Sequence, residues 1–294
     1  MGAEEKNCRI AIVGERFGKE RALYGINHAD LRGCSFAGDE DGESALKETS
    51  DICMTDCAFM LRYPLWHCRG FYMENCVMGS TCRAAVWYSS RGVVVNSHLD
   101  GIKCLRECSA VTVKGGSIDS EECGWKCADM AFEDASVTSQ YFMLDSRNVT
   151  FRNSELNGKY SFQYTENVTV ENSRLNTKDA FWHAKNVTVK NCEVRGEYLA
   201  WYSENVTFID CRIIGTQPLC YCKGLTLINC TMDDCDLSFE YSDVEADIVG
   251  EIMSVKNVRS GHVAADKIGE IITEGSVIEC KCDIRVRKQI SGKD

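Results

Sequence analysis

The chain has 294 residues, of which 44% are hydrophobic and 26% are charged, and this composition excludes a disordered chain because it can bury a large core. Its formal net charge of -11 argues against nucleic acid or an anionic membrane as a partner, because like charges repel. No stretch is apolar for long enough to span a bilayer and no signal peptide is recognisable, so we predict a cytoplasmic protein.

The first part of the chain is irregular. We predict an N-terminal segment at residues 1–20, one solenoid from 21 to 284 and a basic tail at 285–294, and the two end segments either cap the fold or are disordered. Apolar residues recur early, but at uneven separations, which places insertions near Gly38 and Gly79. Loops of this kind on a rigid scaffold often carry function, so we expect them to wall a cleft beside Lys47, His67 and Trp87.

From residue 111 onward the pattern becomes regular, with a period of nineteen residues. The column Val149, Val168, Val187 and Val206 is followed two positions later by Phe151, Val170, Val189 and Phe208. Alternation with a period of two indicates a short strand in each repeat. A third apolar column, which includes Leu156 and Leu175, is often followed by a glycine turn, as at Gly158 and Gly196.

Asparagine and cysteine occupy fixed positions in the repeat. Asn148, Asn167 and Asn186 belong to one column and Asn153 and Asn172 to another, and we expect them at bends because Asn tolerates left-handed backbone. The position after the second column is always small and often cysteine, which we interpret as a compact buried hydrophobe. The pairs Cys104/Cys108, Cys123/Cys127 and Cys220/Cys222 differ in spacing, so we predict no metal site and no other cofactor.

Near the C-terminus, "ADIVGEIMS" from Ala246 returns nineteen residues later as "ADKIGEIIT". About thirteen coils of a single-stranded parallel β-helix with a nineteen-residue repeat therefore account for the chain, and the fold class is all-β. The segments "ERALYG", "GESALKE", "RYPLWHC", "AVWYS", "KDAFWH" and "EYLAWYS" resemble a bacterial family of unknown function in the pectin-lyase-like superfamily of right-handed β-helices. The resemblance implies the fold and leaves the reaction open, because this superfamily contains lyases, hydrolases and non-enzymes.

Two further columns depart from the repeating pattern of apolar, asparagine and small residues, and they contain all five tryptophans. The first reads Tyr24, Lys47, Trp66, Trp87, Arg106, Trp125, Leu144, Gln163, Trp182, Trp201, Cys220 and Phe239. The second reads Gly25, Glu48, His67, Tyr88, Glu107, Lys126, Asp145, Tyr164, His183, Tyr202, Tyr221 and Glu240. We call them the tryptophan column and the tyrosine column, and we expect the tryptophan column to point outward because it follows an inward position.

Aromatic planes beside charged groups suit a carbohydrate, so we predict an oligosaccharide ligand on this face. The predicted binding residues are Trp66, His67, Trp87, Tyr88, Trp125, Tyr164, Trp182, His183, Trp201 and Tyr202. The competing interpretation is structural: like residues stack in parallel coils, so a tryptophan ladder can simply cover a sheet, and Glu107, Lys126 and Asp145 can form a surface ion-pair ladder.

The candidate catalytic residues are Lys47, Glu48, Arg106, Glu107, Lys126 and Asp145. Glu107 and Asp145 are two coils apart, about 9.6 Å, which is marginal for the carboxylate pair of an inverting glycosidase. A lyase needs one base and a nearby cation, which Lys47, Arg106 or Lys126 can supply, so we favour a lyase over a hydrolase if the protein is an enzyme. The alternative is a non-catalytic scaffold that binds a glycan or a protein, and the oligomeric state is open.

Overall fold

The computed structural model describes residues 9–39 and 42–287, and these residues contain strands and turns but no helix. They form an all-β parallel solenoid of about 14 turns, close to the number expected, with a spacing of about 19 residues per turn. The chain divides into two compact units, residues 1–127 and 128–294, here called unit 1 and unit 2. Each is described by itself below. No helix long and apolar enough to cross a membrane occurs among the described residues.

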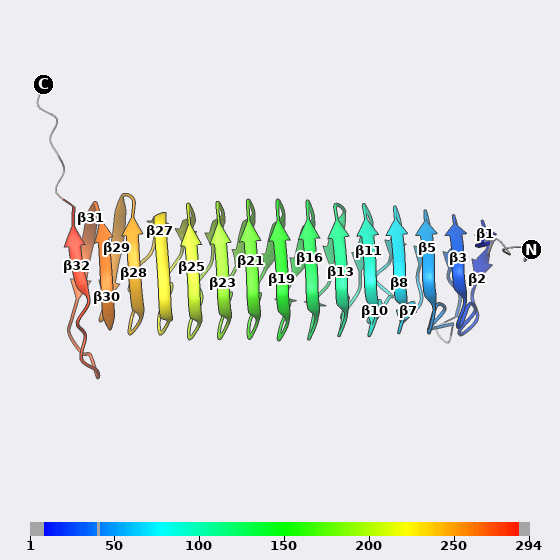
Figure 1. Ribbon diagram of the computed structural model, residues 1–294, viewed down its shortest axis with the longest axis horizontal. Helices are drawn as coiled ribbons and strands as arrows, with labels where there is room; N and C mark the ends of the chain where they lie inside the picture. Colours follow the sequence, from blue (N-terminus) through cyan, green and yellow to red (C-terminus); the bar gives the residue numbers. More distant parts are fainter. Residues whose placement is uncertain (1–8, 40–41, 288–294) are drawn as a thin grey trace, which may run out of the picture. The chain divides into compact units, whose positions relative to one another are not determined.

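Unit 1 contains two ladders of parallel strands and a short third pair (Figure 1, blue to cyan). The longer ladder pairs β1 (Ile10–Val13), β3 (Asn27–Arg32), β5 (Ser50–Thr55), β8 (Arg69–Glu74), β11 (Ser90–Val95) and β13 (Ser109–Lys114) in that order. The shorter ladder pairs β2 (Arg16–Phe17), β4 (Ser35–Phe36), β6 (Ala58–Phe59), β9 (Val77–Met78), β12 (His98–Asp100) and β14 (Ser117–Asp119). On the third side of the coils, β7 (Leu65–Trp66) pairs with β10 (Val86–Trp87), and β15 (Glu122–Cys123) follows later in the chain.

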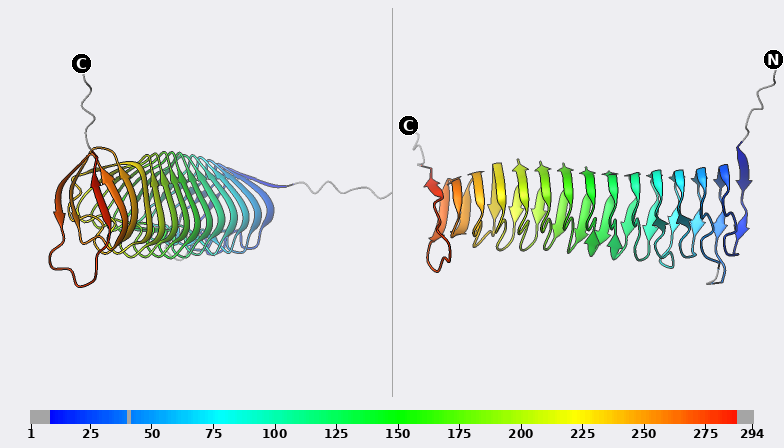
Figure 2. Two further views of the ribbon diagram at one scale, coloured as in Figure 1. Left: turned by 60° about the vertical axis from the view of Figure 1, so that its left-hand side comes forward. Right: turned by 60° about the horizontal axis from the view of Figure 1, so that its bottom comes forward.

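Unit 2 repeats this plan with greater regularity (Figure 2, green to red). Its longer ladder runs through β16 (Ala128–Glu133), β19 (Arg147–Arg152), β21 (Glu166–Glu171), β23 (Lys185–Lys190), β25 (Glu204–Ile209), β27 (Lys223–Asp233), β28 (Asp243–Ile248), β30 (Ser260–Ala265) and β32 (Asp283–Val286). Its shorter ladder runs through β17 (Ser136–Ser139), β20 (Glu155–Gly158), β22 (Arg174–Thr177), β24 (Glu193–Arg195), β26 (Arg212–Ile214) and β27. The remaining strands are β18 (Tyr141–Phe142) and the pair β29 (Glu251–Lys256) and β31 (Lys267–Ile272).

The strand boundaries differ slightly from the predicted limits of the solenoid. β1 and β2 lie inside the segment 1–20 and already pair with β3 and β4, and β32 extends two residues beyond 284. The ends of that segment and of the tail, residues 1–8 and 288–294, lie outside the described residues.

The inward positions of the repeat build the core, as predicted. In unit 1 the rings of Phe17, Phe36 and Phe59 stack at 5.1 and 4.7 Å. In unit 2 Phe162 and Phe181 are fully buried and stack at 5.1 Å. The expected small column is buried as well. Cys68 is a buried cysteine outside this column, and its burial raises the pKa of its thiol to about 11. The thiol therefore stays protonated and unreactive at neutral pH.

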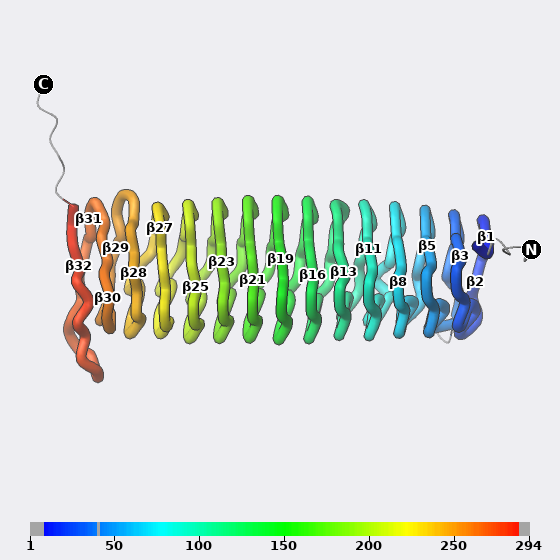
Figure 3. Tube along the Cα trace, viewed as in Figure 1, coloured from blue at the N-terminus to red at the C-terminus, as the bar shows by residue number. Residues whose placement is uncertain are grey.

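The asparagine columns lie at bends, as their residue type predicts. Asn148, Asn167 and Asn186 all have φ between 55° and 59°, and their side-chain amides are joined by hydrogen bonds of 3.0 Å from coil to coil. Left-handed backbone costs about 1 kcal/mol or more for most residues and is least unfavourable for Asn and Asp. These ladders therefore let the chain turn in every coil (Figure 3).

The third side of each coil, between the shorter strand and the next long strand, has an unusual backbone. In unit 2 the residues Asp179, Phe181 and His183 all have positive φ, and so do Tyr198, Ala200 and Tyr202 one coil later. In the first of these coils Ala180 and Phe181 are buried, Trp182 is half-buried and His183 is exposed, so this side carries both predicted functional columns at its outer end.

Candidate functional site

The tryptophan column of unit 1 is a stack of rings and cations. The Nζ atom of Lys47 lies 3.6 Å from the ring centre of Trp66, and Trp66 stacks on Trp87 at 5.0 Å with an angle of 14° between the planes. Farther along, the guanidinium of Arg106 lies 5.6 Å from the ring centre of Trp125. Neighbours thus cover the faces of Trp66, and a sugar ring has no room between rings 5.0 Å apart because it needs about 3.5–4 Å on each side.

The tyrosine column of unit 1 forms a chain of polar contacts. The Nδ1 atom of His67 lies within hydrogen-bonding distance of Oε1 of Glu48, at 2.7 Å. The ring centre of His67 lies 5.3 Å from that of Tyr88. The pKa of Tyr88 is raised because its hydroxyl donates a hydrogen bond to the Glu107 carboxylate. Glu107 also lies 3.3 Å from Nε of Arg106, and Lys126 is exposed. Most of the candidate catalytic groups in this unit are therefore engaged with one another.

In unit 2 the two tryptophans have structural hydrogen bonds. Trp182 and Trp201 stack at 5.5 Å with only 4° between their planes. The indole nitrogen of Trp182 donates to the carbonyl of Tyr198 at 2.6 Å, and that of Trp201 donates to the carbonyl of Gln217 at 2.7 Å. Both side chains are half-buried rather than fully outward, and each fixes the backbone of the following coil.

The tyrosine column of unit 2 is exposed. Tyr164, His183, Tyr202 and Tyr221 stack in sequence at 5.0, 5.2 and 4.7 Å, each pair at 11°. Tyr164 is 55% exposed and Tyr202 45%. Because the faces cover one another, the rings present their edges to solvent, and the expected stacking of sugars on ring faces does not apply to the inner members of this column.

Two details of the predicted columns change. Phe239 is fully buried, and Tyr241 stacks beside Tyr221 at 5.9 Å, so the last coil is shifted by one residue from our alignment. Asp145 is exposed and belongs to unit 2, whereas Glu107 belongs to unit 1, so their proposed separation as a carboxylate pair stays a prediction. The insertions at Gly38 and Thr81 line a pocket of about 270 Å³ with Met60, Leu61 and Arg62, and Lys47, His67 and Trp87 do not line it.

A neighbouring column of unit 2, which the sequence analysis did not single out, forms a pocket. It reads Tyr141, Tyr160, Asp179, Tyr198 and Gln217 at the same nineteen-residue spacing. Tyr141 and Tyr160 stack at 4.9 Å, but the next position is an aspartate instead of a third ring. Asp179 thus leaves a gap between Tyr160 and Tyr198, which are two coils apart, about 10 Å at the usual strand spacing. We call this gap the Asp179 slot.

The Asp179 slot belongs to a pocket of about 470 Å³ lined by Tyr160, Lys178, Asp179, Trp182, Tyr198, Trp201 and Gln217. Lys178 lies at its side, with Nζ 5.2 Å from the ring centre of Tyr198 and 2.7 Å from Oε2 of Glu197. That contact to Glu197 raises the pKa of Lys178, so the ammonium stays charged. The pocket therefore combines two tyrosine rings, one cation and a carboxylate.

Asp179 is the least expected member of this pocket. Its side chain is 7% exposed, and no hydrogen bond to its carboxylate occurs within the described residues. Burial raises its pKa, although Lys178 opposes the shift. Its oxygens are not among the buried side-chain atoms that lack a partner, so they are reached from the pocket and are open to a hydrogen-bond donor on a ligand.

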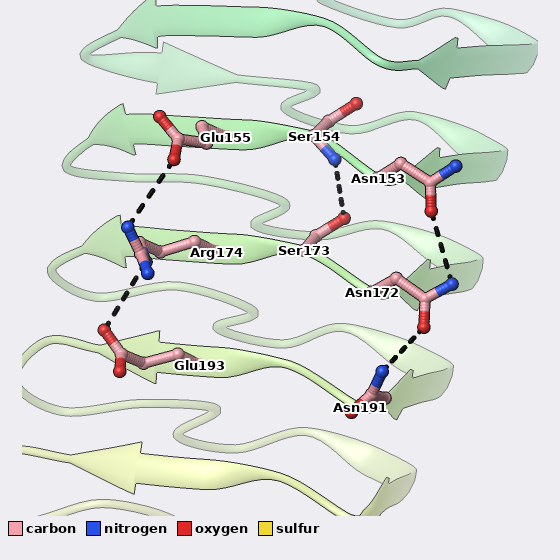
Figure 4. Close-up of a pocket in the computed structure, with 8 residues that line it drawn as sticks. All are labelled: Asn153, Ser154, Glu155, Asn172, Ser173, Arg174, Asn191 and Glu193. Atoms are coloured by element: carbon pink, nitrogen blue, oxygen red, sulfur yellow. Dashed lines mark hydrogen bonds and ion pairs between the residues drawn. The ribbon is translucent and has the colours of Figure 1, made fainter.

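A second groove of unit 2 shows the opposite arrangement (Figure 4). It has a volume of about 380 Å³ and lies along the asparagine ladder, where Asn172 donates to Asn153 and accepts from Asn191. Arg174 bridges Glu155 and Glu193 at 3.6 and 3.7 Å. Its polar groups satisfy one another, so this groove is explained by coil stacking, and the Asp179 slot is the better candidate for a ligand.

The slot could have been found from the sequence. The aligned segments contain "KDAFWH", and extending the alignment toward the preceding turn places Asp179 between two tyrosines. The signal is a small or charged residue that interrupts a column of large rings. Among the described residues, no group of three or more His, Cys, Asp or Glu side chains is placed to hold a metal ion.

Comparison with known proteins identifies the family of the chain, whereas its similarity to solved structures is low. The A-module of Azotobacter vinelandii mannuronan C-5 epimerase AlgE6 aligns with a TM-score of 0.38 and 10% identity over 91% of this chain and 92% of its own. The catalytic domain of a GH87 alpha-1,3-glucanase, solved with tetrasaccharides, aligns with a TM-score of 0.24 and 11% identity over 96% of this chain and 62% of its own. No curated protein sequence matches significantly. The family model described as "Protein of unknown function (DUF3737)" matches residues 11–285, and the chain therefore belongs to the DUF3737 family.

Proposed function

We propose that the protein binds a carbohydrate, with one sugar ring held in the Asp179 slot of unit 2. The observation that carries this proposal is the carboxylate of Asp179, which lines the pocket between two tyrosines and accepts no hydrogen bond from the described residues, although the residue as a whole is only 7% exposed. A sugar hydroxyl is a neutral donor that can satisfy such a carboxylate. Binding would then supply the hydrogen bond that the protein itself lacks.

The dimensions of the slot support a single ring. Two contacts of about 3.5–4 Å, one to each tyrosine face, require a separation of about 7–8 Å, and two coils provide about 10 Å. The Nζ atom of Lys178 lies over the ring of Tyr198 at 5.2 Å, so a sugar that packs on that face must displace the Lys178 side chain. The C–H faces of a pyranose are apolar and pack on aromatic rings, while its hydroxyls reach polar groups at the edge. Lys178 and Gln217 line the same pocket and can donate to ring or hydroxyl oxygens.

The charges favour a neutral sugar over a uronic acid at this position. Asp179 lies at the base of the slot and Glu197 holds the ammonium of Lys178, so a second carboxylate on the ligand would be repelled. The proposal concerns recognition and not turnover. Four of the six candidate catalytic residues, Lys47, Glu48, Arg106 and Glu107, are engaged in contacts with neighbours in unit 1.

The experiment is a binding screen of the full chain by thermal shift and calorimetry against neutral and acidic oligosaccharides. A ligand at one hundred times its dissociation constant raises stability by about 2.7 kcal/mol, which is readily measured. Tyr198→Ala should abolish the response to neutral sugars. Tyr202 is a matched control because it is a tyrosine with positive φ in the tyrosine column, and Tyr202→Ala should leave the response unchanged. Absence of binding to every sugar, or equal loss in both variants, would refute the slot as the site.

A second candidate function is a protein-binding surface on the exposed tyrosine column of unit 2. The edges of Tyr164, His183 and Tyr202 form a continuous exposed strip, and aromatic residues are enriched at protein interfaces. Under this alternative, Tyr202→Ala weakens capture of a partner and Tyr198→Ala does not. The same pair of variants therefore separates the two functions.

A further inference from the structure

Unit 1 has a pocket at the repeat position that corresponds to the Asp179 slot. The column there reads Tyr63, Ala84 and Lys103, and the small side chain of Ala84 leaves a gap between two larger ones. A pocket of about 220 Å³ is lined by Tyr63, Arg83, Ala84, Trp87, Lys103 and Arg106. Its chemistry differs from that of unit 2 because three of its six residues are cations.

The positive charge of this pocket is only partly balanced. Arg83 is exposed and forms no ion pair with a carboxylate of the described residues. Lys103 forms an ion pair of 3.7 Å with Oε2 of Glu122, a buried oxygen that accepts no hydrogen bond from the described residues. Arg106 uses only Nε toward Glu107, at 3.3 Å, and its terminal nitrogens have no carboxylate within the described residues. The pocket thus carries an excess of donors in a protein whose net charge is -11.

The indole nitrogen of Trp87 lacks the hydrogen bond that Trp182 makes, and among the described residues the buried indole nitrogen of Trp66, which does not line this pocket, also has no acceptor. In unit 2 Trp182 donates to the carbonyl sixteen residues later, in the next coil. The equivalent carbonyl for Trp87 is that of Lys103, but the buried Nε1 of Trp87 has no acceptor among the described residues. A buried donor without an acceptor is unfavourable and calls for an explanation.

We propose that this pocket of unit 1 binds an oxyanion, that is, a carboxylate, sulfate or phosphate group of a small ligand. The planar guanidinium groups of Arg83 and Arg106 can each bind two oxygens of such a group, and the ammonium of Lys103 adds a further donor. Trp87 and Tyr63 form the aromatic wall of the pocket. The site is independent of the carbohydrate slot, because all six of its residues belong to unit 1.

The test is a titration of the full chain with sodium sulfate, inorganic phosphate and sodium glucuronate, each at constant ionic strength, followed by calorimetry and tryptophan fluorescence. We expect saturable binding of at least one of the three, and the one that binds identifies the group. Arg83→Gln should weaken this binding by about tenfold or more, because a charge-assisted bidentate contact is lost. Ala84→Tyr, which refills the column, should abolish it.

Two controls make the result decisive. Arg69→Gln removes the same charge from an exposed arginine of β8 that does not line the pocket, and it should leave the dissociation constant unchanged. Asp179→Asn in unit 2 should also have no effect, which separates this proposal from the carbohydrate slot. Absence of saturable binding with all three anions, or an equal loss in Arg83→Gln and Arg69→Gln, would overturn the proposal.

Discussion

The same position of the repeat opens a pocket in both units, but the two pockets have opposite chemistry. In unit 1 Ala84 lies between Tyr63 and Lys103 and the lining is cationic, whereas in unit 2 Asp179 lies between two tyrosines and the lining is aromatic with a buried acid. The ladders on either side are parallel in both units: β9–β12 and β8–β11 in unit 1, and β20–β22–β24 and β21–β23 in unit 2. The difference shows that every coil has the same backbone position here. The side chain at that position determines whether the column is a continuous stack or contains a pocket.

The largest expected effect separates inward residues from those that line the slot. Phe181 is fully buried two residues after Asp179, and Phe181→Ala should lower the free energy of unfolding by about 3–5 kcal/mol. Tyr198→Ala should cost much less, because its ring lies on the pocket side. Urea denaturation of the two variants measures both values, and equal losses would show that Tyr198 is a core residue.

The next effect is on binding. Asp179→Tyr restores an unbroken tyrosine column and should close the slot, so that the affinity for a neutral oligosaccharide falls by about a hundredfold, or about 2.7 kcal/mol. Tyr198 already has φ of 55° in this column, so a tyrosine is compatible with the backbone at Asp179. Calorimetry decides the matter, and unchanged affinity would place the sugar elsewhere.

A smaller effect contrasts the tryptophans of the two units. Trp182→Phe removes an indole donor from the carbonyl of Tyr198 and should cost about 1 kcal/mol beyond the loss of packing. Trp87→Phe removes a donor that has no acceptor among the described residues, so it should carry no such additional cost. Thermal unfolding of both variants tests the contrast, after the stability lost through the smaller ring is subtracted for each. A larger remaining loss for Trp87→Phe would contradict it.

The smallest effect is expected at the groove beside the asparagine ladder. Arg174 is exposed, and its ion pairs with Glu155 and Glu193 are longer than 3.5 Å. Arg174→Ala should therefore change stability by less than about 1 kcal/mol, and the change should shrink further at high salt. A loss of several kcal/mol in chemical denaturation would mean that these surface pairs hold the coils together.

Much of the fold could be predicted because the repeat imposes the same physical demand in every coil. Val168 and Val170 face the core and Asn167 and Asn172 bend the chain, so periodicity and residue type were sufficient. The last coil was misaligned because the spacing of nineteen fails between Tyr221 and Tyr241.

The candidate site was harder to predict because it depends on a gap. Trp182 and Trp201 were predicted as ligand-binding residues and do line the pocket, but their hydrogen bonds to the next coil depend on geometry that the sequence does not express. Asp179 was missed because an acid in a turn is usually solvated, and only the structure shows that it is 7% exposed. The catalytic roles predicted for Lys47, Glu48, Arg106, Glu107, Lys126 and Asp145 stay predictions, as does the cytoplasmic location.

The central claim is that Asp179 is kept for a ligand at the expense of stability. Burial raises its pKa above the value of about 3.8 expected in the unfolded chain, so the folded state binds more protons between these two values. The stability of the wild-type protein should therefore decline as the pH rises through the pKa of the folded state, whereas Asp179→Asn lacks this titration.

The most direct measurement is the free energy of unfolding of wild type and Asp179→Asn from pH 4 to pH 7, without ligand. The account predicts that the variant gains stability relative to wild type as the pH rises through the folded-state pKa of Asp179, and that it no longer binds sugar. A variant that is less stable than wild type at pH 7, or that keeps full affinity for the sugar, would contradict the claim and make Asp179 a structural residue.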